Sequence, residues 1–206
     1  MDIQVRKLAE GDDLTQVSRL IYETDNYIFP HFFGQSTTSA KEILPFMIEA
    51  DTIYNKNNIY IALLDNQIIA VIVIVPLPIS INLGAFIDSF EKANAMIDES
   101  FQKVMMEYFI PMEALPEGYY IANLCVDELY RGKGVGSAML DLILEEIDKE
   151  KDVYLDCLTD NARAISVYEA HDFEKLFEFS GFTGLPYYKM IRRASRAQIE
   201  AGNLEE

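Results

Sequence analysis

The segment Arg131-Gly132-Lys133-Gly134-Val135-Gly136 constrains this chain more than any other part of its sequence. It joins a predicted strand, Tyr119–Val126, to a predicted helix over residues 134–150. Three glycines at alternate positions leave little side chain between the backbone and a ligand. Free amides and the positive end of a helix would point at one place, and Arg131 and Lys133 add formal charge there. The sequence therefore predicts an anion site whose expected ligand is a phosphate.

Two common phosphate loops fit this segment poorly. A P-loop needs Ser or Thr after its lysine, whereas Gly134 follows Lys133 here. A dinucleotide-binding loop needs Gly-x-Gly-x-x-Gly in an early strand–helix–strand unit, with an acidic residue about 20 positions later. Asp156 lies near that distance, but the spacing is Gly-x-Gly-x-Gly and no tandem strand–helix–strand units precede it. From the glycines alone, a tight turn without a ligand stays an alternative.

A second motif follows the glycine loop and gives it a context. The run Val126-x-x-x-Tyr130-Arg131-Gly-x-Gly-x-Gly is followed by Asn161-Ala-x-Ala-x-x-x-Tyr168-Glu and then Phe173. Together they resemble the GNAT superfamily of acyl-CoA N-acyltransferases. Its signature is Arg/Gln-x-x-Gly-x-Gly/Ala after the fourth strand, followed by an Asn-led helix that carries a Tyr. The resemblance is close over residues 119–179. Where the family commonly has Gly-Phe, this chain has Asp172 before the Phe, so we expect Asp172 in a left-handed conformation.

The resemblance implies an α/β fold. The expected sheet is mixed and mostly antiparallel, has about six or seven strands flanked by helices, and carries a helical insertion over residues 76–118 between the third and fourth strands. We expect a single domain over 1–192, followed by a polar tail over 193–206. Apolar residues between Phe90 and Tyr108 recur at helical spacing, which predicts one amphipathic helix of around five turns. That helix could pack on the core, cover the acceptor site or form a dimer surface.

Local signals predict several element boundaries. Asp12 or Asp13 can cap the first helix. The pattern Ser39-x-x-Glu42 is typical of a capping box at the start of a second helix. Pro76 and Pro78 are predicted to end the third strand.

The resemblance also implies the coenzyme site. In the family the fourth and fifth strands part, and the pantetheine arm pairs with the backbone groups that this frees. The pyrophosphate is expected on the amides from Arg131 to Ser137. The expected cofactor contacts are Leu124, Cys125, Val126, Arg131, Gly132, Lys133, Gly134, Val135, Gly136, Ser137, Asn161, Arg163 and Tyr168. The expected cofactor is acetyl-CoA as co-substrate, and no metal is expected because the sequence has no Cys or His cluster.

Tyr168 is the predicted catalytic residue. It lies seven residues after Asn161, about two helical turns, so both side chains face the same side of the helix. A phenol near the thioester sulfur could protonate the leaving thiolate. Asn161 could cap the helix through its oxygen and still bind the coenzyme through its NH2 group. Core packing of the Tyr168 ring and capping alone by Asn161 stay alternatives.

The general base has no clear candidate. The family often places a Glu or His on the fourth strand, which here has neither. Glu23, Asp25 and His31 are candidates elsewhere, and His31 has a suitable intrinsic pKa. A water chain ordered by Tyr120 or Asn123 is an equal alternative. We therefore leave the base unassigned.

The expected function is acetyl-CoA-dependent N-acetyltransfer, in which a primary amine of a small molecule or peptide attacks the thioester directly. The alternative is a catalytically idle acyl-CoA-binding sensor or interaction module, because the strand base is missing. The net charge of −17 argues against nucleic acid and is compatible with a cationic acceptor, although solubility alone is the favoured explanation of the charge. No apolar run reaches the ~18 residues of a membrane helix, and the N-terminus does not resemble a signal peptide. We therefore expect a cytoplasmic protein without a membrane partner, which could form a homodimer.

Overall fold

The computed structural model describes residues 3–34, 37–181 and 183–195. Its centre is a seven-stranded sheet with the order β1-β2-β3-β4-β5-β7-β6. Among the described strands, neighbours run antiparallel except for the parallel pair β4–β5. The strands are β1 (Gln4–Lys7), β2 (Ile59–Leu64), β3 (Gln67–Leu77), β4 (Gly118–Val126), β5 (Asp152–Leu158), β6 (Phe173–Ser180) and β7 (Pro186–Arg192). The mixed, mostly antiparallel sheet expected from the sequence is confirmed.

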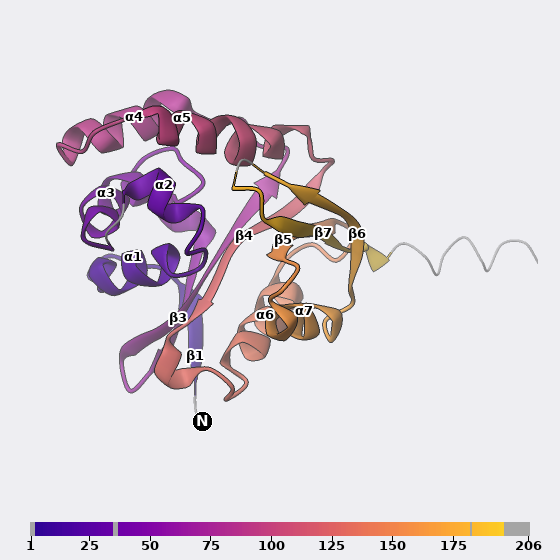
Figure 1. The fold of residues 1–206 in the computed structure, drawn as a ribbon. Coiled ribbons are helices and arrows are strands. Elements are labelled where there is room, and N and C mark those ends of the chain that lie inside the picture. The colour runs from indigo at the N-terminus through magenta and orange to yellow at the C-terminus, as the bar shows by residue number, and fades with distance from the viewer. Residues whose placement is uncertain (1–2, 35–36, 182, 196–206) are drawn as a thin grey trace, which may run out of the picture.

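Helices cover both faces of the sheet, and each face has its own hydrophobic cluster (Figure 1). One face carries α1 (Leu14–Tyr22), α2 (Phe29–Phe33), α3 (Thr37–Glu49), α4 (Leu83–Lys92) and α5 (Glu99–Val104), and the other carries α6 (Val135–Glu146) and α7 (Ala162–Glu169). Val71 and Val73 of β3 belong to the first cluster, whereas Ile72 and Ile74 belong to the second. Because both faces of β3 are buried, its sequence is a continuous apolar run. None of the described helices has the length and apolar character needed to cross a membrane.

The start of α1 separates the roles of two neighbouring aspartates. The carboxylate of Asp13 accepts the backbone N–H groups of Thr15 and Gln16, so Asp13 is the cap. Asp12 instead accepts two hydrogen bonds from the Arg6 guanidinium, each 2.7 Å long. The ion pair connects β1 to the loop before α1.

One predicted boundary is wrong, and another is correct only in part. Helix α3 begins at Thr37, so Ser39 lies inside its first turn rather than before it. Strand β3 ends at Leu77, directly before Pro78 as predicted, but it continues through Pro76, which pairs with Tyr119. The pairing of β3 with β2 ends at Val73, so beyond that point one edge of β3 is open. A proline is tolerated there because its missing N–H breaks no ladder hydrogen bond on the open edge.

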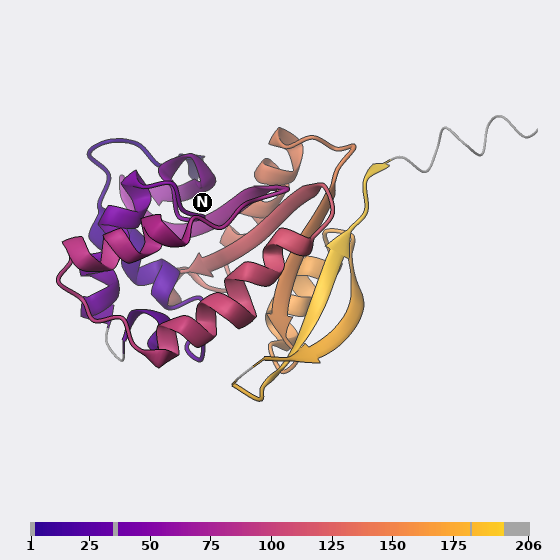
Figure 2. The same cartoon turned by 90° about the horizontal axis from the view of Figure 1, so that it is seen from above.

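The segment 76–118 contains two α-helices where the sequence predicted one. Asn94 follows α4 with φ of 52°, a left-handed conformation that ends the helix. Asp98 then caps α5. The chain continues through a π-helical turn η2 (Met105–Phe109) and a 3-10 turn η3 (Ile110–Ala114). The apolar spacing persists across the break because both helices pack on one core, where the rings of Phe90 and Phe101 lie 4.9 Å apart. Figure 2 shows these helices at the end of the sheet where β3 ends and β4 begins.

The parallel pair β4–β5 opens partway along its length. Its pairing ends at Ile121 and Leu155, although the strands continue to Val126 and Leu158. On its other edge β4 stays paired with β3, with a bulge at Ala122. A bulge bends a strand locally and increases its twist, which gives a physical reason for the parting. The later part of β4 therefore has backbone groups on the β5 side that no strand pairing satisfies.

The described residues end at Ser195, soon after β7. Most of the predicted polar tail, 196–206, lies outside them. The described part forms one sheet with a core on each face, and the assignment of 1–192 to a single domain stays a prediction.

Candidate active site

The glycine loop begins after β4 with a short 3-10 turn, η4 (Glu128–Tyr130). Asp127 caps this turn by accepting the Leu129 N–H at 3.0 Å. Gly132 and Gly134 have φ of 76° and 82°, a region that residues with a Cβ rarely adopt. Gly134 is also the N-cap of α6, and a glycine supplies no capping side chain. The first amides of α6 are thus left without a side-chain cap, as an anion site at a helix N-terminus requires.

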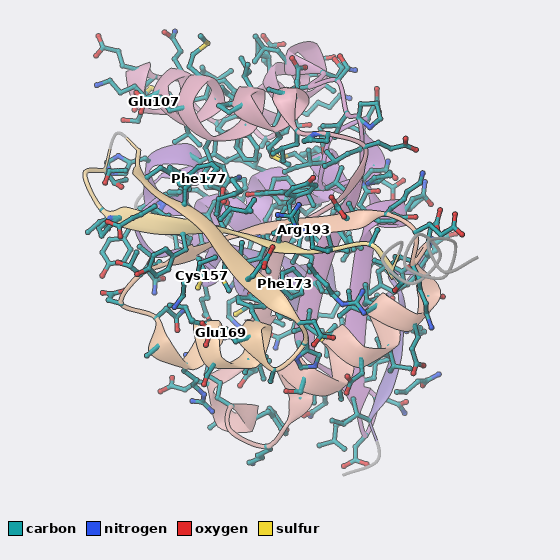
Figure 3. The ribbon with its side chains drawn as sticks, turned by 90° about the vertical axis from the view of Figure 1, so that its right-hand side faces the viewer. Glu107, Cys157, Glu169, Phe173, Phe177 and Arg193 are labelled. Atoms are coloured by element: carbon teal, nitrogen blue, oxygen red, sulfur yellow. The ribbon has the colours of Figure 1, made fainter. Side chains whose placement is uncertain are left out.

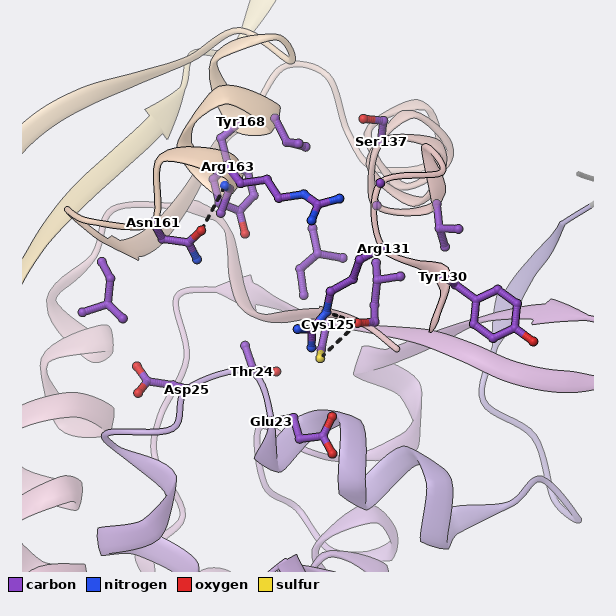
Figure 4. A pocket seen from close by; sticks show the side chains of 18 of the residues that line it. Glu23, Thr24, Asp25, Cys125, Tyr130, Arg131, Ser137, Asn161, Arg163 and Tyr168 are labelled. Carbon is purple, nitrogen blue, oxygen red and sulfur yellow. Dashed lines mark hydrogen bonds between the residues drawn. The ribbon is translucent and has the colours of Figure 1, made fainter. Parts of the chain in front are cut away.

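Two arginines accompany these amides. A Cβ on Gly132 would lie 2.7 Å from the Nη2 of Arg163, so the glycine gives this guanidinium of α7 room to approach the loop. The Nε of Arg131 donates to the carbonyl of Val126 at 2.8 Å, which places this side chain at the end of β4. Figure 4 shows both side chains extending into the same space.

The loop forms one end of a cleft of about 520 Å³ (Figure 4). The cleft is lined by Glu23, Thr24, Asp25, Asn26, Tyr27, Leu124, Cys125, Val126, Tyr130, Arg131, Gly132, Gly134, Val135, Gly136, Ser137, Leu158, Asn161, Arg163, Ala164, Val167 and Tyr168. The cleft therefore brings together every predicted coenzyme residue except Lys133. The Nζ of Lys133 lies 5.2 Å from the centroid of the Tyr130 ring instead.

Helix α7 presents Asn161 and Tyr168 to the cleft. The Oδ1 of Asn161 caps the helix by accepting the Ala164 N–H at 3.1 Å. The hydroxyl of Tyr168 points into the cleft (Figure 4). Its ring packs edge-on against Phe173, with centroids 5.7 Å apart. Asp172 has φ of 66°, the left-handed conformation that the sequence predicted.

Three titratable groups of this region keep their protons at neutral pH. Burial raises the pKa of Tyr168, and the neighbouring Cys157 and Cys125 raise it further. Burial likewise raises the pKa of Cys125 to about 11 and that of Cys157 to about 12. Figure 3 shows Cys157 between the sheet and the helix that carries Glu169. The cysteines therefore remain thiols, and Tyr168 keeps a proton that it can donate.

The segment between α1 and α2 lines another part of the cleft, away from Ser137 and Arg163 (Figure 4). We call this part, residues 23–27, the acceptor end. The carboxylate of Asp25 accepts a hydrogen bond from the Tyr187 hydroxyl at 2.9 Å. Of the three base candidates taken from the sequence, Glu23 and Asp25 line the cleft. His31 is exposed and is not among the lining residues.

Arg19 connects the acceptor end to the glycine loop. Its guanidinium binds Glu23 at 2.9 Å and makes a short ion pair with Asp127. Because Asp127 also caps the turn that leads into the glycine loop, α1 is attached to the loop's first residues. Sequence reasoning missed this link, since Asp127 lies 108 positions after Arg19 in the chain.

Sequence reasoning also missed a role for Asp156 in this region. Asp156 follows Leu155, the last residue of β5 that pairs with β4. Its carboxylate accepts a hydrogen bond from the Tyr120 hydroxyl at 2.9 Å and forms an ion pair with the Lys189 Nζ at 2.7 Å. The Asp156 side chain is 9% exposed. A lone acidic residue inside the apolar run Val153–Leu158 was the available signal, but its partners come from two other strands.

The sequence model of the Acetyltransferase (GNAT) family matches residues 21–173. The chain belongs to this family. The matched span contains both the glycine loop and the Asn161–Tyr168 motif, and the family resemblance drawn from those two motifs is confirmed.

Known proteins similar to this GNAT chain include acetyltransferases of several kinds. N-alpha-acetyltransferase 60 of Danio rerio is 40% identical over 78 residues, which cover 35% of this chain and 30% of that protein. A solved structure described as histone acetyltransferase HPA2 and related acetyltransferase from Corynebacterium glutamicum has a TM-score of 0.66 at 16% identity, covering 97% of this chain and 100% of that one. The NatC complex bound to Gag peptide and CoA has a TM-score of 0.59 at 15% identity, covering 94% and 99%. At such identities the solved structures show a shared fold.

Proposed function

We propose that this GNAT protein transfers an acetyl group from acetyl-CoA to a primary amine by direct attack. The observation that carries the proposal is that three parts line one cleft. They are the glycine loop with its uncapped amides, the parted ends of β4 and β5, and Tyr168. They suit the pyrophosphate, the pantetheine arm and the thioester of acetyl-CoA, respectively.

The backbone and two arginines would hold the coenzyme. The amides from Arg131 to Ser137 suit the pyrophosphate, and Arg131 and Arg163 add charge-assisted hydrogen bonds to it. The unpaired edge of Leu124–Val126 offers peptide groups to the amides of the pantetheine arm. A free N–H on this edge would also polarise the thioester carbonyl.

The reaction requires two proton movements. A neutral amine forms a C–N bond to the thioester carbon while the C–S bond breaks. Tyr168 gives its proton to the leaving sulfur and regains one from the nitrogen, so that an amide and free coenzyme A result. Burial keeps the Tyr168 hydroxyl in its protonated form throughout the neutral range, so a proton is present on it when the thiolate leaves.

For the acceptor, we propose only that it carries a primary amine. A small-molecule amine or a peptide fits the proposal, and the peptide is supported by the names of the relatives, one an N-alpha-acetyltransferase and another a complex bound to a peptide. A cytoplasmic location and a homodimer are further proposals, which cell fractionation and sedimentation would test.

An amine panel tests the proposal directly. The purified chain is mixed with acetyl-CoA and with a polyamine, an amino sugar or short peptides that have a free N-terminus. Free thiol is then measured, and the acetylated product is identified by mass spectrometry. We expect release of thiol that depends on one of these amines. Tight coenzyme binding without thiol release from any amine would favour the idle sensor instead.

A tyrosine pair tests the chemical step. Tyr168→Phe should lower turnover at neutral pH by about 100-fold, because it removes the proton donor, while the affinity for coenzyme A stays the same. Tyr60→Phe is the matched control, since both side chains are 8% exposed and belong to the same hydrophobic cluster. Equal turnover in the two variants would remove Tyr168 from the mechanism.

A further inference from the structure

A buried polar cluster lies next to the acceptor end of the cleft. Asp156 of β5 is its centre, bound by Tyr120 of β4 and Lys189 of β7. Alternate residues of a strand share one face, so Asp156 projects to the same side of the sheet as Leu158, which lines the cleft. Asp25 connects the cluster to the cleft from the other side, since it lines the cleft and accepts a hydrogen bond from Tyr187.

We propose that Asp156 receives the proton that the acceptor amine loses, with the Tyr120 hydroxyl as the link, and that Lys189 is a positioning residue that keeps Asp156 ionised. This inference rests on the proposed function. It supplies the base that the fourth strand lacks.

Two aromatic rings hold the Lys189 ammonium beside the Asp156 carboxylate. Its Nζ lies 5.1 Å from the Tyr120 ring centroid and 5.7 Å from that of Phe179. The side chains of Lys189 and Asp156 are 13% and 9% exposed, so water screens their attraction little. The Tyr120 ring, whose hydroxyl donates to the same Asp156 carboxylate, is therefore one of the two rings that contact the Lys189 ammonium.

Opposing influences act on the pKa of Asp156. Burial raises the pKa of Asp156, whereas the Lys189 ammonium and the Tyr120 hydrogen bond oppose this rise. A carboxylate with a raised pKa is a stronger proton acceptor. Asp156 therefore combines a raised affinity for protons with a counter-charge that favours its ionised form.

Besides Lys189 and the Asp25 carboxylate, which accepts the Tyr187 hydroxyl, the titratable groups around Asp156 are neutral hydroxyls and a thiol. Burial raises the pKa of Tyr108, Tyr120 and Tyr187, and the charge of Asp156 adds to this. The Cys157 thiol is also held protonated, mainly by burial. Tyr108 comes from the turn η2, so the inserted segment 76–118 supplies one wall of the cluster.

The proton balance of the step is complete. The ammonium proton of the acceptor passes through the Tyr120 hydroxyl to the Asp156 carboxylate, which leaves a neutral amine and a carboxylic acid. The amine then forms the C–N bond as the C–S bond breaks, with Tyr168 protonating the sulfur and regaining the nitrogen proton. Asp156 finally releases its proton to solvent.

The pH dependence of turnover tests both residues. Asp156→Asn should lower kcat/KM by about 100-fold or more, with the coenzyme dissociation constant unchanged. Lys189→Met should move the acid limb of the pH–rate profile upward by about one pH unit or more, because a nearby cation lowers the pKa of a carboxylate. Lys189→Arg should return the limb toward its original position. Lys175→Met is the control, since Lys175 also pairs with a carboxylate and lies over a tyrosine ring, but on exposed surface.

Several outcomes would overturn the inference. A Lys189→Met variant that loses the same fraction of turnover at every pH would show that the ion pair only supports the fold. If that variant does not fold, Tyr120→Phe gives the same test, and an unmoved acid limb would contradict the proposal. If the wild-type protein is active and Asp156→Asn keeps more than half of the wild-type turnover, the role of Asp156 is refuted while the proposed function stands. Wild-type protein that releases no thiol with any amine would end the proposed function as well.

Discussion

The two ends of the cleft are built in different ways. The phosphate end consists mainly of backbone amides from one continuous segment, 131–137, with Arg163 added from α7. The acceptor end and its buried cluster consist of side chains from the α1–α2 segment, β4, β5, β7 and the insertion. The phosphate end therefore depends on the left-handed backbone conformation that glycine allows, and the acceptor end depends on which side chains the fold brings together.

Because of this difference, recognition of the acyl donor and recognition of the acceptor amine depend on different kinds of groups. Backbone amides bind a phosphate whatever the side chains are, as long as the loop keeps its left-handed glycines. A carboxylate such as Asp25, which has no ion pair to the loop among the described residues, can change with the acceptor, whereas Glu23 is linked to the loop through Arg19 and Asp127. The charged residues that line the cleft also differ, since Arg131 and Arg163 stand at the phosphate end and Glu23 and Asp25 at the acceptor end. This arrangement is consistent with an anionic coenzyme meeting a cationic amine.

The largest expected effect comes from placing a charge in the phosphate end. Gly134→Glu should weaken coenzyme A binding by about 100-fold, which is about 2.7 kcal/mol, because a carboxylate would stand among the amides that face the phosphates. Gly134→Ala is the matched control, since it has the same left-handed strain, at about 1–2 kcal/mol, with open space for its Cβ. Titration by calorimetry measures both. Wild-type affinity in Gly134→Glu would mean that the phosphates lie elsewhere.

Arg19 offers a way to disturb both ends together. Arg19→Met should lower the free energy of unfolding by about 2 kcal/mol, because Asp127, only 14% exposed, loses its charged partner. Coenzyme affinity should fall several-fold, since the turn before the glycine loop loses its attachment to α1. Arg6→Met breaks another Arg–Asp pair, neither residue of which lines the cleft, and should destabilise the fold without changing coenzyme affinity. Equal coenzyme affinity in the two variants would show that the attachment of α1 does not influence coenzyme binding by the glycine loop.

The sequence predicted the local structure of the glycine loop and of α7 well because the groups involved are neighbours in the chain. Glycine spacing, the cap at Asn161 and the left-handed Asp172 are local features, and the structure has each of them. Lys133 is the exception, because spacing predicts where a Cα lies but not that the side chain turns toward Tyr130.

The acceptor end could not be predicted in the same way. The pairing of Asp156 with Tyr120 and Lys189 depends on strand order, in which β7 lies between β5 and β6. The inserted helices show the same limit, since a single helix and a broken one with a common core have the same apolar spacing. The break at Asn94 required a backbone conformation that hydrophobic periodicity does not report.

Asn161 allows the cap and the coenzyme contact to be measured apart. Asn161→Ser keeps a capping oxygen but removes the NH2 group, so stability should change by less than about 0.5 kcal/mol. Coenzyme affinity should fall by about fivefold, the effect of roughly one hydrogen bond. Asn161→Ala should show the same loss of affinity together with a loss of about 1 kcal/mol in stability. Urea unfolding and calorimetry measure the two effects. Unchanged affinity in Asn161→Ser would leave this residue with capping alone.

The smallest expected effect concerns Lys133, which the sequence predicted in the site but which does not line the cleft. We compare it with Arg163, which does. Lys133→Ala should change coenzyme affinity by less than about twofold, since an exposed charge held over the Tyr130 ring is screened by water and salt. Arg163→Ala should weaken binding by about tenfold, because its guanidinium lies beside Gly132 inside the cleft and can make charge-assisted hydrogen bonds to a phosphate. Both variants remove one positive charge, so a net-charge effect would make their losses equal. Affinities measured at low and high salt decide between these cases: a loss confined to low salt in both variants would mean that long-range charge, rather than contact, attracts the coenzyme.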